Sequence, residues 1–60
     1  MEDMKAELDL LMERAAECAL ISSQTSDKKK RDLFAKLAEH YSVLASELER
    51  AIAEAQHGAQ

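Results

Sequence analysis

The chain has 60 residues, of which 47% are hydrophobic and 33% charged, and its twelve acidic and eight basic residues give a net charge of -4. A chain of this length forms at most one small domain and buries little surface alone, so residues 1–60 are predicted to form a single unit. One glycine and no proline favour a helical chain over a disordered tail. Cys18 is the one cysteine, which excludes an intrachain disulfide and favours a reducing compartment.

The start of the chain and its hydropathy indicate where the protein works. The sequence begins Met1-Glu2-Asp3, which is acidic where a secretory signal peptide would be basic. No apolar run approaches the roughly 20 residues that a helix needs to cross a bilayer. We therefore expect a cytoplasmic protein that does not use a membrane as a partner.

The first predicted helix covers residues from about 2 to 23. Apolar or small residues recur there at alternating steps of three and four, which is the a/d pattern of a heptad. Met12 and Ala19 occupy adjoining e positions, so the stripe is wider than a two-stranded coiled coil requires and is typical of a helix in a bundle. The a/d positions are Met1, Met4, Leu8, Leu11, Ala15, Cys18 and Ser22.

The turn is predicted at about residues 24–27. The segment from Ser22 to Asp27 concentrates Ser, Thr, Gln and Asp, and the side chains of Ser, Thr and Asp bond to nearby backbone groups and favour turns and helix N-caps. The chain should therefore reverse its direction here.

The second predicted helix covers residues from about 28 to 57, and Gly58 is its natural terminator. It repeats the heptad and also has a wide stripe, with Ala38, Ala45 and Ile52 at e positions. The a/d positions are Phe34, Leu37, Tyr41, Leu44, Leu48, Ala51 and Ala55.

Folding the chain back near residue 26 brings the two stripes together in antiparallel register. Large side chains near the turn in the second helix then face small ones in the first, which close packing favours. The predicted fold class is therefore all-α, an antiparallel two-helix hairpin. The predicted pairs are Cys18 with Phe34, Ala15 with Leu37, Leu11 with Tyr41, Leu8 with Leu44 and Met4 with Leu48.

A hairpin of this kind leaves apolar surface uncovered, because two helices share only a line of contact. Closing two hairpins into an antiparallel four-helix bundle would bury both stripes, and twofold symmetry is the commonest oligomeric solution. We therefore predict a homodimer. The predicted self-association residues are Met4, Leu8, Leu11, Met12, Ala15, Cys18, Phe34, Leu37, Tyr41, Leu44, Leu48 and Ile52, and the apolar residues outside the stripes, which leave room for a further interface, are Leu10, Leu20, Ile21, Leu33 and Val43.

Four consecutive cations, Lys28, Lys29, Lys30 and Arg31, follow the predicted turn. Such a run can contact phosphates, and this defines the alternative of a nucleic-acid-associated regulator. Aromatic residues for stacking bases are missing from the segment apart from one that the helix contact claims. Two acid-before-base pairs at i, i+4, Asp27 with Arg31 and Asp32 with Lys36, favour a solvated helix start instead. Nucleic acid is therefore not the expected partner.

Residues that could carry chemistry are few. Cys18 lies on the predicted seam, where a buried thiol is an inert small hydrophobe. Glu54 and His57 have the E-x-x-H spacing of carboxylate-bridged metal bundles, but no glutamate of the first helix occupies an a or d position to join them. His40 and Tyr41 fit a boundary and a core position. We predict no catalytic residue, no metal site and no cofactor.

The order of residues also resembles a known group. Arg14-Ala15-Ala16-Glu17-Cys18-Ala19-Leu20, a polar break, and then the segments Arg31–Glu39 and Tyr41–Ala45 are similar to a pattern, AxEC…R..f..LA..w..LA, of short alphaproteobacterial proteins that are abundant in rhizobia. The match covers about residues 11–50. Tyr41 stands where tryptophan is frequent, and the proline common in the break is missing. The resemblance implies a bacterial, cytosolic helical hairpin, implies no substrate or cofactor, and makes Glu17-Cys18 a pair to test by substitution.

The sequence thus favours a small self-associating helical interaction or structural module without catalytic activity. Two other hypotheses stay open. One is the regulator that uses the basic segment at residues 28–31, and the other is an adaptor that exchanges its own copy for a helix of another protein.

Overall fold

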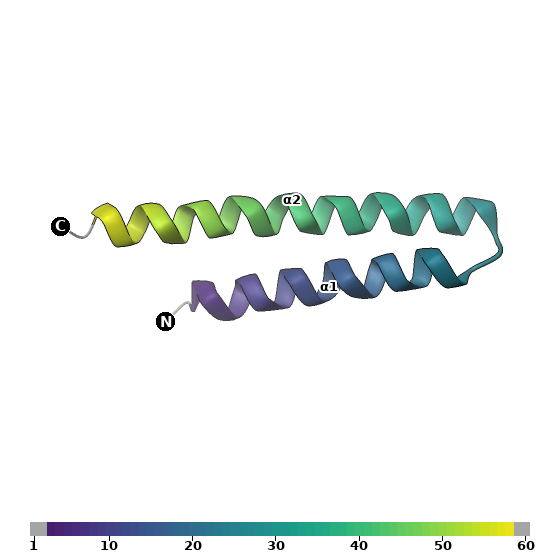
Figure 1. The fold of residues 1–60 in the computed structure, drawn as a ribbon, viewed down its shortest axis with the longest axis horizontal. Helices are drawn as coiled ribbons and strands as arrows, with labels where there is room; N and C mark the ends of the chain where they lie inside the picture. The colour runs from purple at the N-terminus through teal and green to yellow at the C-terminus, as the bar shows by residue number, and fades with distance from the viewer. Residues whose placement is uncertain (1–2, 59–60) are drawn as a thin grey trace.

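The computed structural model describes residues 3–58 and contains two helices, α1 (Met4–Gln24) and α2 (Lys28–Gly58). The helices lie side by side and antiparallel, with their connection at one end and both chain ends at the other (Figure 1). The prediction of an all-α two-helix hairpin is therefore confirmed. The heptad position assigned to Met1 lies outside the described residues.

The start of α1 is fixed by Asp3. Its backbone is extended, and its carboxylate accepts hydrogen bonds from the backbone N–H groups of Lys5 (3.1 Å) and Ala6 (3.3 Å). These two N–H groups have no partner inside the helix, so the side chain satisfies donors that would otherwise bond only to water. The helix therefore begins at Met4, two residues after the predicted start.

The turn between the helices has three residues, 25–27. Thr25 is extended, and its N–H donates to the carbonyl of Ile21 (3.1 Å), which completes α1. The Thr25 hydroxyl then accepts from the N–H of Asp27 (3.2 Å). This short side-chain to backbone bond closes the reversal, as the composition of the segment predicts.

Asp27 caps the N-terminus of α2. Its Oδ1 accepts from the backbone N–H groups of Lys29 (3.0 Å) and Lys30 (3.5 Å), and its carbonyl accepts from the N–H of Arg31 (2.8 Å). A side-chain oxygen of Asp at this position satisfies unpaired donors of the first helical turn. The second helix therefore begins at Lys28, directly after the cap.

One side chain joins the two helices across the turn. The Ser22 hydroxyl, in the last turn of α1, donates a 2.9 Å hydrogen bond to the carbonyl of Arg31 in α2. This bond fixes the spacing of the helices at the closed end of the hairpin.

The contact between the helices follows one stripe on each. On α1 the inward residues are the predicted a/d residues, and Cys18 is 9% exposed, whereas the predicted e residues Met12 and Ala19 are exposed. On α2 the most buried residue is Ala45, at 7%. The half-buried apolar residues around them are Met4, Leu8, Leu11 and Ala15 on α1, and Phe34, Leu37, Ala38, Tyr41, Leu48 and Ile52 on α2.

The prediction that Leu44 faces Leu8 inside the hairpin is wrong. Leu44 is 48% exposed, whereas its neighbour Ala45 is buried. Two heptad stripes can be drawn on α2, and both contain Phe34, Tyr41 and Leu48. One stripe adds residues 37, 44 and 51, and the other adds the residues that directly follow them, 38, 45 and 52. The hairpin contact lies nearer the second stripe, because the small side chain of Ala45 lets the two backbones approach.

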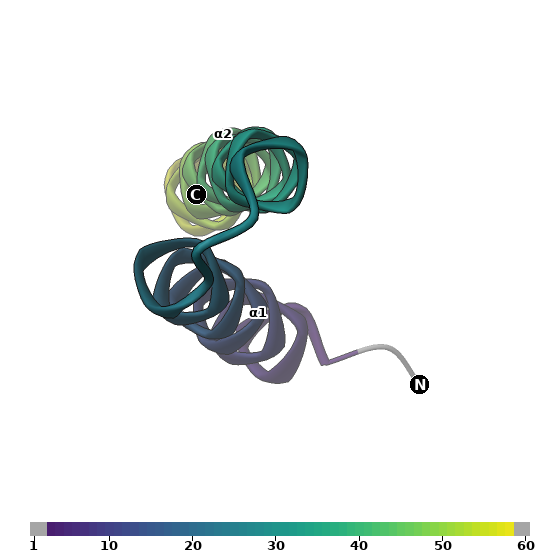
Figure 2. The same cartoon turned by 90° about the vertical axis from the view of Figure 1, so that its right-hand side faces the viewer.

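The hairpin is long and thin. Its extents are 51 × 17 × 14 Å, and its radius of gyration is 14.4 Å, whereas a compact domain of this length would have about 10 Å. Viewed from the turn, residues 3–58 form two helices side by side (Figure 2). The ten extra residues of α2 extend past the start of α1 by about 15 Å at 1.5 Å per residue.

The Asp27 cap leads to a prediction. Asp27→Ala removes the acceptor for two backbone N–H groups and should lower the free energy of unfolding by about 1 kcal/mol. Ser26→Ala is the matched control, since the hydroxyl of this neighbouring turn residue makes no hydrogen bond within residues 3–58. Urea denaturation followed by circular dichroism at one fixed protein concentration measures both. Equal stability of the two variants would contradict the capping role.

Candidate self-association surface

The predicted self-association residues divide into two groups in the hairpin. Ten of the twelve are buried or half-buried, within the stripes where α1 meets α2. The other two, Met12 and Leu44, are exposed, at 53% and 48%. Most of the predicted residues therefore already pack between α1 and α2 of one chain. The apolar side chains that a second chain could contact are mostly other residues.

Large apolar side chains remain exposed on both helices. Among the described residues only Cys18 and Ala45 are buried, while seven large apolar side chains are exposed. The sequence pattern identified them as apolar, but placed five of them outside the stripes. The exposed residues are Leu10, Met12, Leu20, Ile21, Leu33, Val43 and Leu44.

The hairpin has more solvent-accessible surface than a compact protein of the same mass. The accessible surface of the chain is 4956 Å² for a mass of 6.7 kDa. A compact monomer of this mass would expose about 3,900 Å², so the hairpin has an excess of about 1,000 Å². A standard protein interface removes about 800 Å² from each partner. The excess is thus of the size that one interface covers.

The exposed apolar residues are not spread evenly around the hairpin. Leu10 and Ile21 are eleven residues apart on α1, and Leu33 and Leu44 are eleven residues apart on α2. Eleven residues make about three helical turns, so each pair lies on one side of its helix. We call the surface formed by these four residues the Leu10–Leu44 face.

The lining of two shallow hollows shows that both pairs lie on the same side of the hairpin. Leu48, one turn after Leu44, lines one hollow with Leu10 and Leu11. Met12 lines a different hollow with polar residues of α2, among them Ser42 and Glu49. The second side, which we call the Met12–Ser42 face, is therefore more polar. Leu20 and Val43 point away from the contact between the helices, by the helical repeat.

Cys18 lies inside the hairpin contact, as the heptad predicts. The thiol is free and buried. Burial among apolar side chains keeps a thiol away from reagents and from a general base, so Cys18 packs as a small hydrophobe.

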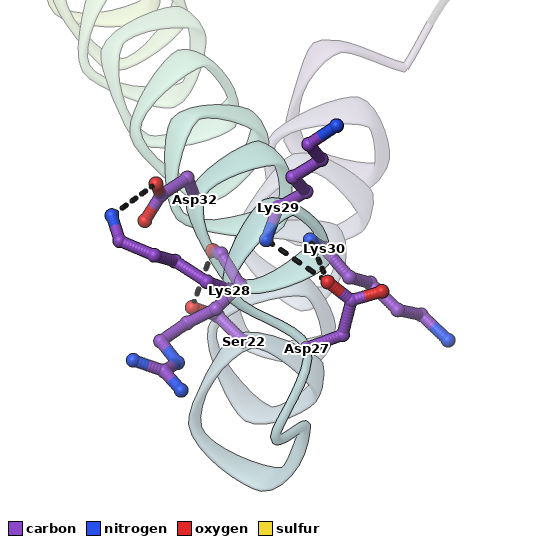
Figure 3. Close-up of polar contacts among 7 residues, drawn as sticks. Ser22, Asp27, Lys28, Lys29, Lys30 and Asp32 are labelled. Atoms are coloured by element: carbon purple, nitrogen blue, oxygen red, sulfur yellow. Dashed lines mark hydrogen bonds and ion pairs between the residues drawn. The ribbon is translucent and has the colours of Figure 1, made fainter.

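The basic segment at residues 28–31 forms the first turn of α2. The side chains of Lys28, Lys29 and Lys30 extend in different directions from the helix (Figure 3). Consecutive helical residues are about 100° apart, so these three ammonium groups are spread around the first turn of α2. All four cations of the segment are exposed.

The predicted ion pairs of this segment are wrong. In the described residues the salt bridge is instead Lys28 with Asp32, at 3.5 Å, and both side chains are largely exposed (Figure 3). The Oδ1 atom of Asp27 accepts instead from the backbone N–H groups of the cap. An exposed pair of this kind contributes at most about 1 kcal/mol.

Residues considered for chemistry do not come together in the described part of the chain. No group of three or more His, Cys, Asp or Glu residues there could hold a metal ion. His40 is exposed and lines an open hollow with Val43, Leu44 and Glu47. The side chain of His57, and with it the E-x-x-H pair, lies outside the described residues.

Within residues 3–58, neither helix contains a stretch long and apolar enough to span a membrane. No protein-family model, curated protein or solved structure matches this chain. A proposal about function therefore depends on the surface of the hairpin itself.

Proposed function

We propose that this protein is a small self-associating helical module that acts by binding and has no catalytic activity. The observation that carries the proposal is the surface excess of about 1,000 Å², with seven large apolar side chains exposed. Apolar surface in contact with water costs about 25 cal/mol per Å², so covering it stabilises the chain. A second copy of the chain exposes the same apolar side chains, so two copies can cover each other's apolar surface in a symmetric dimer.

The shape of the hairpin supports association in preference to ligand binding. The hollows on its surface are shallow and open, and small-molecule sites are normally enclosed clefts. A long flat pair of helices presents instead the kind of surface that a second pair covers in a four-helix bundle. A free buried thiol is compatible with action in a reducing cytoplasm.

The alternative, a nucleic-acid-associated regulator, has weaker support. Four exposed cations can bind phosphates as a solvated patch. Phe34 is half-buried in the contact between the helices, which leaves the patch without an aromatic platform. The exposed apolar residues also have no role in this alternative.

Self-association makes thermal stability depend on concentration. If folding and dimerisation are coupled, a tenfold increase in chain concentration should raise Tm by about 5 °C for a dimer of this size. Circular dichroism melts over a hundredfold range of concentration measure this shift. A Tm that does not change over the range would contradict the proposal.

The alternative has its own test. The self-association proposal predicts no retardation of duplex or single-stranded DNA or RNA in a gel-shift experiment at low salt, where electrostatic binding is strongest. The control is the triple variant Lys28→Gln, Lys29→Gln and Lys30→Gln. Retardation by the natural chain that this variant abolishes would favour the regulator instead.

A further inference from the structure

We propose that a second copy of this chain docks antiparallel on the Leu10–Leu44 face, with the twofold axis beside Leu44 at the middle of α2. This inference rests on the proposed function, since it specifies the surface and the orientation of the same association. It differs from the sequence prediction in two respects, because it brings Leu10, Ile21 and Leu33 into the interface and leaves Met12 outside it.

The choice of face follows from composition. The Leu10–Leu44 face carries four of the seven exposed large apolar side chains, and Leu48 and Leu11 extend it toward the contact between the helices. The Met12–Ser42 face carries one, among serines and Glu49. The area left over by the hairpin matches one standard interface, so one face is enough to cover it.

The position of the axis follows from the lengths of the helices. The midpoint of α2 (Lys28–Gly58) is residue 43, and Leu44 is adjacent to it. Leu10 lies 14 residues before the end of α1, and Leu44 lies 16 residues after the start of α2, so both are at about the same height, 21–24 Å from the turn. An axis at this height brings Leu44 next to Leu44 of the second copy.

The charge distribution favours the antiparallel orientation. The half of the hairpin between the turn and the axis, residues 10–43, has six bases and five acids. The open half, residues 3–9 and 44–58, has six acids and two bases. Antiparallel docking places the basic half of each copy beside the acidic half of the other, whereas parallel docking would place the two acidic halves together.

The overhang of α2 also fits this orientation. In an antiparallel pair, residues ten positions before and ten positions after the midpoint of α2 face each other. Leu33 of one copy therefore lies against the overhang of the other, between Ala51 and Ala55. A large exposed side chain then meets small ones, as close packing requires.

The face is tested by two matched substitutions in the otherwise unmodified chain. Leu44→Asp and Met12→Asp each place a carboxylate at a half-exposed apolar position. We expect Leu44→Asp to raise the dissociation constant at least about 100-fold, because two carboxylates meet at the axis, and Met12→Asp to change it less than about threefold. Light scattering coupled to gel filtration measures both. A natural dimer that survives Leu44→Asp, or that Met12→Asp dissociates instead, overturns this inference and leaves the proposed function in place.

The orientation is tested by disulfide cross-linking in a Cys18→Ala chain. Leu44→Cys should cross-link to itself on mild oxidation, since the two sulfurs can approach only if their Cα atoms are within about 7 Å. Leu33→Cys is the control and should stay monomeric on a denaturing gel, because antiparallel docking separates its two copies by about 30 Å.

A parallel dimer would give a different product. In that arrangement Leu10 of one copy faces Leu44 of the other, so a mixture of Leu10→Cys and Leu44→Cys chains would form a mixed disulfide and neither chain would cross-link to itself. This result overturns the antiparallel proposal. If the natural chain stays monomeric at all concentrations, the proposed function fails as well, and light scattering separates the two failures.

Discussion

The constraint on which this structure depends is that two helices touch along a single line. The hairpin is held by a stripe on each helix, with Cys18 and Ala45 as its buried residues in the described part of the chain. Seven large apolar side chains stay exposed, because residues 3–58 form two helices and no third element that could cover them (Figure 2). The self-association that we propose is the simplest physical answer to this shortage.

The polar residues serve the geometry of the hairpin. Asp3 and Asp27 each use their carboxylates to cap a helix, and Ser22 joins the two helices across the turn. These bonds set where each helix starts and how the helices are aligned near the turn. The exposed apolar residues therefore have fixed positions along the hairpin, and four of them form the Leu10–Leu44 face.

The sequence predicted the hairpin and the stripe on α1 because local signals determine both. Turn-forming side chains at residues 22–27 and the heptad from Met4 to Ser22 leave one arrangement of α1. The stripe on α2 was harder to predict, because two heptads share Phe34, Tyr41 and Leu48. The close approach of the two helix backbones decides which of the two heptads faces α1. The spacing of residues within α2 alone does not predict this choice.

The candidate surface was predicted less well than the fold, for the same reason. The prediction placed Leu44 in the hairpin contact and so treated Leu10, Ile21 and Leu33 as scattered surface residues. In the structure Leu44 is exposed, as is Leu33, and the eleven residues between them put both on one side of α2. The ion pairs were wrong, since the salt bridge within residues 3–58 joins Lys28 to Asp32, and Oδ1 of Asp27 accepts from the backbone N–H groups of the cap. A pattern of charges does not show which acceptors the backbone has already taken.

We propose that the hairpin pairs with a second copy because it has about 1,000 Å² of excess surface and exposes seven large apolar side chains. Sedimentation equilibrium over a range of concentrations tests it most directly, because it gives the mass of the species in solution without labels or substitutions. The account predicts a mass of twice the 6.7 kDa chain at micromolar concentration. A single species of 6.7 kDa that also unfolds cooperatively would contradict it.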